Sequence, residues 1–101
     1  MGTVVPLRSR ADRRPEPLWR QAVGAQLREE RQRRQERIAD VAGRAGVSPQ
    51  YLSELERGRK DPSSEVLAAV SGALGLTVLV VAERSAQRLG EGSRGPVCLA
   101  A

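Results

Sequence analysis

Residues 41–58, VAGRAGVSPQYLSELERG, constrain the fold more than any other part of the chain. The segment predicts two short helices joined by a tight turn. Gly46 is expected to end the first helix, because glycine adopts the left-handed conformation at low cost. Ser48-Pro49 suits the start of the second helix, with serine as N-cap and proline as the first helical residue. Leu52 and Leu55, three positions apart, then face a core, and the polar residues between them face outward.

Apolar residues elsewhere also recur at helical spacing, so the sequence predicts an all-α fold with five helices. Trp19, Val23 and Leu27 lie four apart and predict a first helix over residues 18–34, with Trp19 in the core or in a dimer contact. The other expected helices cover residues 38–45, 49–57, 64–74 and 77–90. The β-branched residues 77–82 also suit a short edge strand that pairs two chains, and this alternative stays open.

Both ends of the chain are expected to be flexible. Residues 1–16 hold four Arg and two Pro without a sustained apolar period, which predicts a basic arm. The arm either stays in solvent or follows phosphates or the minor groove of DNA. Residues 91–101 predict a disordered tail. Between the ends, residues 17–76 form the expected main domain and residues 77–90 a fifth helix or dimerisation segment.

The charge and composition favour a polyanionic partner and exclude several other classes of protein. Seventeen Arg and Lys against twelve Asp and Glu give a net charge of +5, which favours nucleic acid. The chain has no His and one Cys, so a zinc finger, a Ser-His-Asp triad and an internal disulfide are excluded. No enzyme, metal, cofactor or small-molecule ligand is expected. With no apolar run long enough to span a bilayer, we expect no membrane partner and a cytoplasmic location.

Residues 46–63, GVSPQYLSELERGRKDPS, resemble the helix-turn-helix of the phage Cro and repressor family. The resemblance covers residues 18–76 and implies a lambda-repressor-like fold that binds double-stranded DNA, with the third helix in the major groove. The positions that it assigns to base readout are Pro49, Gln50, Tyr51, Ser53 and Glu54. Their chemistry suits this role, because glutamine pairs with adenine and a carboxylate accepts from cytosine. For Tyr51, a contact with the first helix is an equal alternative.

Other residues are assigned to the DNA backbone or to the domain itself. The expected phosphate contacts are Arg57, Arg59 and Lys60, followed by Arg28, Arg37 and Arg44. The resemblance further implies a structural ion pair between Arg31 and Glu56. The family usually has a small polar N-cap before its second helix, where this chain has Arg37. We also expect exposed ion pairs of the i, i+4 type along the first helix, Glu29–Arg33 and Glu30–Arg34.

A narrower resemblance concerns residues 51–75, YLSELERGRKDPSSEVLAAVSGALG, which are similar to the actinobacterial regulators of Clp protease genes. That resemblance implies an activator of Clp genes, with RNA polymerase and Clp protease as further partners. The residues Leu99, Ala100 and Ala101 resemble the end of a peptide tag that marks proteins for Clp proteolysis. They predict a C-terminal degron, and a terminus rich in Ala by chance is the alternative.

The chain is expected to act as a homodimer on a two-fold operator. Val78, Leu79 and Val81 exceed what one small domain covers easily, so they are the predicted dimer contact. Two other functions remain open. One is an antitoxin or autoregulatory repressor of the same fold, and the other is a protein-interaction adaptor without base readout.

Overall fold

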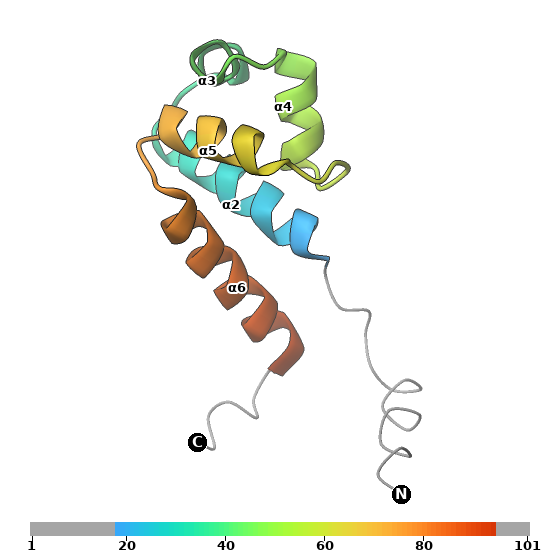
Figure 1. Ribbon diagram of the computed structural model, residues 1–101. Coiled ribbons are helices and arrows are strands. Elements are labelled where there is room, and N and C mark those ends of the chain that lie inside the picture. Colours follow the sequence, from blue (N-terminus) through green and yellow to red (C-terminus); the bar gives the residue numbers. More distant parts are fainter. Residues whose placement is uncertain (1–17, 95–101) are drawn as a thin grey trace, which may run out of the picture.

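The computed structural model describes residues 18–94, with side chains through residue 90. This part of the chain consists of helices joined by turns and irregular segments. It contains α2 (Trp19–Arg33), α3 (Ile38–Ala45), α4 (Pro49–Glu56), α5 (Ser64–Ala73) and α6 (Val78–Arg94) (Figure 1). The predicted all-α fold is confirmed for the described residues. The basic arm and most of the predicted tail lie outside them.

The segment after residue 76 is a helix, so the alternative of an edge strand is wrong. Thr77 caps α6, because its hydroxyl accepts a hydrogen bond from the backbone N–H of Val80 at 3.1 Å. Val81 and Ser85, four residues apart, are both fully buried, as only a helix facing the core would place them. The helix continues to Arg94. Residues 91–94, predicted to belong to a disordered tail, are therefore helical.

The helices enclose one apolar core. Figure 1 shows α2 running through the middle, with α3 and α4 on one side and α6 alongside it, while α5 packs against α3 and α6. The core residues come from all five helices: Val23, Leu27, Val41, Ala42, Leu52, Leu55, Val70, Leu74 and Val81. Trp19 does not belong to this core, because 43% of it remains exposed at the start of α2.

Helices α2 and α4 approach each other closely at Gly24. A Cβ atom at Gly24 would lie 2.2 Å from the carbonyl oxygen of Leu55 and 2.8 Å from that of Glu56. These oxygens belong to the backbone of α4, so no side-chain movement relieves the clash. Glycine at this position therefore sets how near α4 packs to α2.

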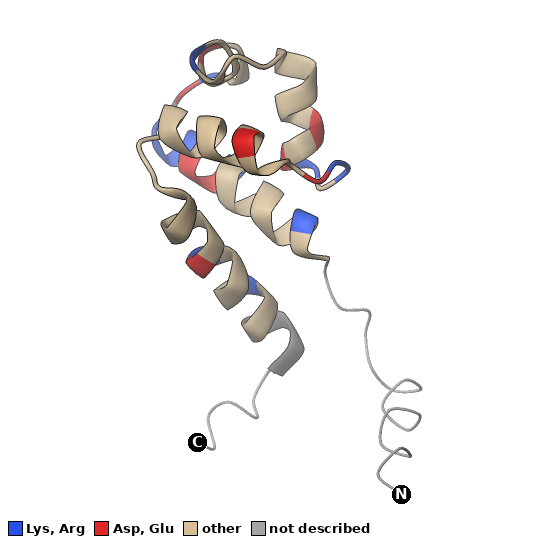
Figure 2. Cartoon of the chain, in the orientation of Figure 1, with Lys and Arg blue, Asp and Glu red and all other residues tan. Residues whose placement is uncertain are grey.

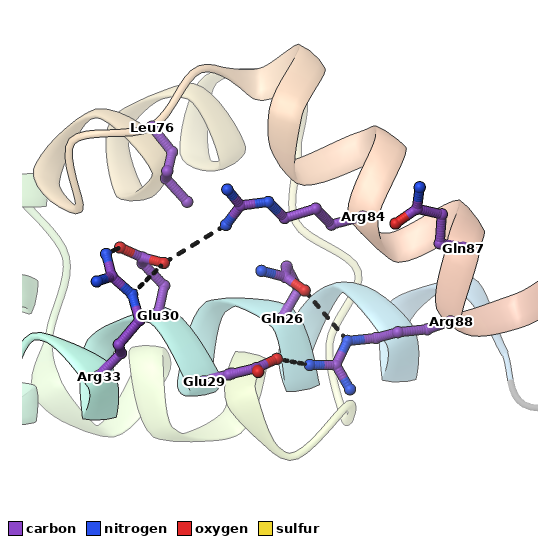
Figure 3. A pocket seen from close by; sticks show the side chains of 8 residues that line it. All are labelled: Gln26, Glu29, Glu30, Arg33, Leu76, Arg84, Gln87 and Arg88. Carbon is purple, nitrogen blue, oxygen red and sulfur yellow. Dashed lines mark hydrogen bonds and ion pairs between the residues drawn. The ribbon is translucent and has the colours of Figure 1, made fainter.

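A set of polar side chains lies between α2 and α6 (Figure 3). The buried carboxylate of Glu30 accepts hydrogen bonds from Arg33 on its own helix and from Arg84 on α6. Arg88 donates to Gln26 at 3.2 Å and also bonds Glu29. The hydrogen bond from Arg33, with the nearby arginine charges, lowers the pKa of Glu30 despite its burial. The side chains drawn in Figure 3 line an open cavity of about 600 Å³.

The observed ion pairs differ from those predicted along α2. Glu29 and Glu30 do not pair with the arginines four residues later: Glu29 pairs with Arg88, and Glu30 pairs with Arg33 and Arg84. The cause is α6, which covers this face of α2 and brings two arginines to it. Within residues 18–94, none of the helices alone has both the length and the apolar composition of a membrane span. Helix α5 and the first part of α6 have them only together, and the two are bent by 98° relative to each other.

Candidate nucleic-acid interface

The turn between α3 and α4 has the predicted geometry. Gly46 lies in the left-handed region with φ 78°, and the N–H of Val47 returns to the carbonyl of Ala42 at 3.0 Å. The Ser48 hydroxyl accepts from the Tyr51 N–H at 3.0 Å, so serine is the N-cap of α4. Both ends of the turn are thus fixed by local hydrogen bonds, and α4 is held at a defined angle to α3.

The predicted base-reading residues are not equally accessible. Pro49 and Gln50 are exposed at the start of α4, whereas Ser53 and Glu54 are half-buried. Tyr51 is also half-buried and packs against the apolar core. Gln50 and Glu54 are four residues apart, so they share one face of the helix.

The implied pair of Arg31 and Glu56 is present and joins α2 to α4. Arg31 donates from Nε to Glu56 Oε2 at 2.7 Å and from Nη2 to Oε1 at 2.9 Å. Its third bond, from Nη1 to the backbone oxygen of Glu36, measures 2.9 Å. The side chains are 14% and 5% exposed. The hydrogen bonds that Arg31 donates to Glu56 raise the pKa of Arg31, and the pair acts as a brace between α2 and α4.

A small cleft lies beside this pair, with a volume of about 140 Å³. It is lined by Arg28, Arg31, Ile38, Ser53, Glu56 and Arg57. Neither Arg28 nor Arg57 forms an ion pair with another residue in the range 18–90, and both are exposed. The cleft therefore brings two uncompensated guanidinium groups from α2 and from the end of α4 next to the Ser53 hydroxyl.

The remaining predicted phosphate contacts differ in whether they form an ion pair inside the domain. Lys60 is exposed and makes no ion pair within the described range. Arg59 lies 3.8 Å from Glu54, and Arg37 lies 3.3 Å from Asp40. Figure 2 shows basic residues in the loop after α4 and near the turn between α2 and α3. Arg37 is the N-cap of α3 and makes no side-chain capping bond, which agrees with its departure from the family's polar cap.

Arg44 has a structural role that the sequence did not predict. Its guanidinium donates to the carbonyl of Ala73 at 2.7 Å and to Glu36 at 2.8 Å. It thereby joins the end of α5 to the turn between α2 and α3. The bond from Arg44 also lowers the pKa of Glu36. Arg44 is therefore a structural brace through Nε and Nη2, while its side chain stays 43% exposed. Its contact with a phosphate stays a prediction.

The predicted dimer residues divide into two groups. Val78 and Leu79 are exposed, at 38% and 66%. Val81 is fully buried against the rest of the same chain, so its assignment to a dimer contact is wrong. It lies in the core because α6 is a helix and turns this residue inward. The proposed degron residues Leu99, Ala100 and Ala101 lie outside the described residues and stay a prediction.

Arg20 is a residue that sequence reasoning missed. Its Nε donates to the carbonyl of Gly58 at 3.2 Å, and its Nη1 lies 3.6 Å from Asp61. Arg20 therefore ties the start of α2 to the basic loop after α4. No sequence signal marks this contact, because the partners are 38 or more residues apart.

A profile of the helix-turn-helix domain family matches residues 22–87. The chain belongs to this family. It is 43% identical over 77 residues to the transcriptional regulator ClgR of Mycobacterium tuberculosis. The aligned region covers 76% of this chain and 69% of that protein. The crystal structure of the clp gene regulator ClgR from Corynebacterium glutamicum has a TM-score of 0.72 and 49% identity, over 75% of this chain and 81% of that one.

A phage protein shares the same architecture. The DNA-binding domain of the P22 c2 repressor superposes with a TM-score of 0.57 and 28% identity, over 74% of this chain and 91% of that domain. The lambda-repressor-like fold and the resemblance to Clp gene regulators are thus confirmed. This member of the helix-turn-helix family is a transcriptional regulator with a DNA-binding fold.

Proposed function

We propose that the chain reads double-stranded DNA with α4 in the major groove. The observation that carries this proposal is the arrangement around α4. One side of the helix buries Leu52 and Leu55 in the core, while its start projects Gln50 outward. The two free arginines of the cleft, Arg28 and Arg57, lie at its flank. A helix held in this way presents base-reading groups beside a phosphate-binding flank.

Each outward side chain has a defined chemical task. Gln50 pairs with the N6 and N7 atoms of adenine, and Glu54 accepts from the N4 amino group of cytosine. Ser53 lines the cleft with Arg28 and Arg57, so it serves a phosphate better than a base. Tyr51 is half-buried against the core, so only part of its side chain is left for a thymine methyl group.

Phosphate contacts and base contacts respond differently to salt and sequence, which gives the test. Replacing Arg57 or Lys60 with Gln should weaken binding to all duplexes alike and flatten the plot of log K against log salt by about 0.9 per contact. Gln50→Ala should instead lower the preference for the operator over random duplex and leave the salt slope unchanged. The proposal fails if Gln50→Ala and Lys60→Gln have the same effect on both quantities.

The genes controlled are, in our proposal, those of the Clp protease, and the effect is activation. The support is the similarity to the clp gene regulator of C. glutamicum at 49% identity and to ClgR of M. tuberculosis at 43%. Transcription in vitro from a Clp gene promoter, with RNA polymerase and increasing regulator, tests both points. A rise in transcript supports activation, a fall indicates a repressor, and binding confined to its own promoter favours an autoregulator or antitoxin.

The active form is proposed to be a homodimer on a two-fold operator. The exposed apolar side chains of Val78 and Leu79, together at the start of α6, support this assembly. Regulated destruction by Clp protease is a separate proposal that rests on Leu99–Ala101 alone. Replacing Ala100 and Ala101 with Asp should lengthen the protein's lifetime in cells with active protease, and an unchanged lifetime would contradict it.

A further inference from the structure

The carboxylate of Glu54 lies at an unfavourable place for a DNA-reading group. It is in the last turn of α4, where the helix dipole disfavours negative charge and no basic residue is present. The same turn holds Glu56, whose charge is balanced by Arg31. In the proposed complex, Glu54 would also lie near the negative charges of the phosphates.

Arg59 supplies the balancing charge for Glu54. Its Nη1 atom lies 3.8 Å from Glu54 Oε2, and the Glu54 side chain is only 24% exposed. The backbone fixes the pair further. Gly58, in the left-handed conformation with φ 75°, reverses the chain, and the N–H of Arg59 bonds the carbonyl of Glu54 at 3.0 Å. Arg59 is therefore anchored to the same residue through its main chain and its side chain.

We propose that Arg59 is a positioning residue for base readout: it holds and screens the Glu54 carboxylate so that this group reaches a cytosine. This inference rests on the proposed function and deepens it, because it moves Arg59 from the uniform phosphate contacts to the determinants of sequence preference. Without Arg59, the carboxylate turns toward water and away from the phosphates. Discrimination at one base pair of each half-site is then lost.

The neighbouring Lys60 is the matched control. It is exposed on the same loop, carries the same charge and makes no ion pair within residues 18–90. Removing Lys60 changes the local net charge as removing Arg59 does, but leaves Glu54 with its partner. A difference between the two variants therefore reports the pairing and not the charge alone.

The test is selection from a randomised operator library by the full chain, followed by sequencing of the bound DNA. The variants are Arg59→Gln, Lys60→Gln, Glu54→Gln and the double variant Glu54→Gln with Arg59→Gln. We expect Arg59→Gln to reduce the preference for cytosine by at least about fivefold at the single position that Glu54→Gln also alters. Lys60→Gln should leave the preference at every position unchanged. In the Glu54→Gln background, the Arg59 change should no longer affect base preference.

The outcomes separate this inference from the proposed function. If the unaltered chain selects no preferred sequence, the proposed base readout is wrong and the inference falls with it. If the chain does select a sequence, but Arg59→Gln lowers all affinities equally as Lys60→Gln does, only the positioning role is overturned. Thermal melts followed by circular dichroism verify that each of the four variants is folded.

Discussion

Removal of the Glu56 carboxylate should destabilise the domain more than any change on its DNA-facing surface. Glu56→Ala deletes two hydrogen bonds, of 2.7 and 2.9 Å, and leaves the Arg31 guanidinium nearly buried without its counter-charge. Breaking a buried pair from one side costs about 3–5 kcal/mol. Arg31 keeps its bond to the Glu36 carbonyl and is 14% exposed. We therefore expect the lower end, about 3 kcal/mol.

Urea and thermal unfolding measure this loss at one fixed protein concentration, because dimerisation links stability to concentration. A loss of about 3 kcal/mol corresponds to a fall in Tm of roughly 12–24 °C for a domain of this size. Replacing both partners, Arg31→Met with Glu56→Leu, should recover most of the stability, since neither charge is then left alone. A loss below about 1 kcal/mol for Glu56→Ala would match an exposed pair and refute the reasoning.

Three further predictions concern packing, assembly and pH. Gly24→Ala should cost about 2 kcal/mol in urea unfolding because its Cβ meets the α4 backbone, whereas Gly43→Ala, with open space around it, should be neutral or stabilising. In analytical ultracentrifugation, Leu79→Asp should give a folded monomer, whereas Val81→Asp should give an unfolded chain; two folded, dimeric variants would contradict both assignments. The lowered pKa of Glu30 means that its stabilising effect is complete above its ordinary value of 4.5 and is lost as the pH falls through the folded value. Below pH 4.5 the free energy of unfolding of Glu30→Gln should therefore fall less steeply with decreasing pH than that of the unaltered chain. The same slope for both proteins would contradict this role of Glu30.

The helix limits were predictable where the signals are local. The helix over residues 38–45 has the predicted bounds, because Gly46 and Ser48-Pro49 stop one helix and start the next by their own backbone chemistry. The segment after residue 76 has only Thr77 as a local start signal. Its β-branched residues suit strand and helix alike, and burial of Val81 and Ser85 against the rest of the fold decides between them.

The site was predictable only in part, for the same physical reason. The pairing of Arg31 with Glu56 followed from the family resemblance, not from spacing. The roles of Arg44 and Glu30 depend on partners 29 and 54 residues away, at Ala73 and Arg84. Neither helical periodicity nor net charge reveals which arginine meets an acceptor inside the domain and which remains free for DNA.

The central claim is that α4 reads base sequence, and recovery of genomic DNA fragments at physiological salt tests it most directly. The purified chain and its Gln50→Ala variant would each be mixed with sheared DNA of the source organism, and the retained fragments sequenced. We predict that the unaltered chain enriches a short inverted repeat upstream of protease genes and that Gln50→Ala loses this enrichment while still binding DNA. Retention of fragments without any shared sequence by both proteins would contradict the claim.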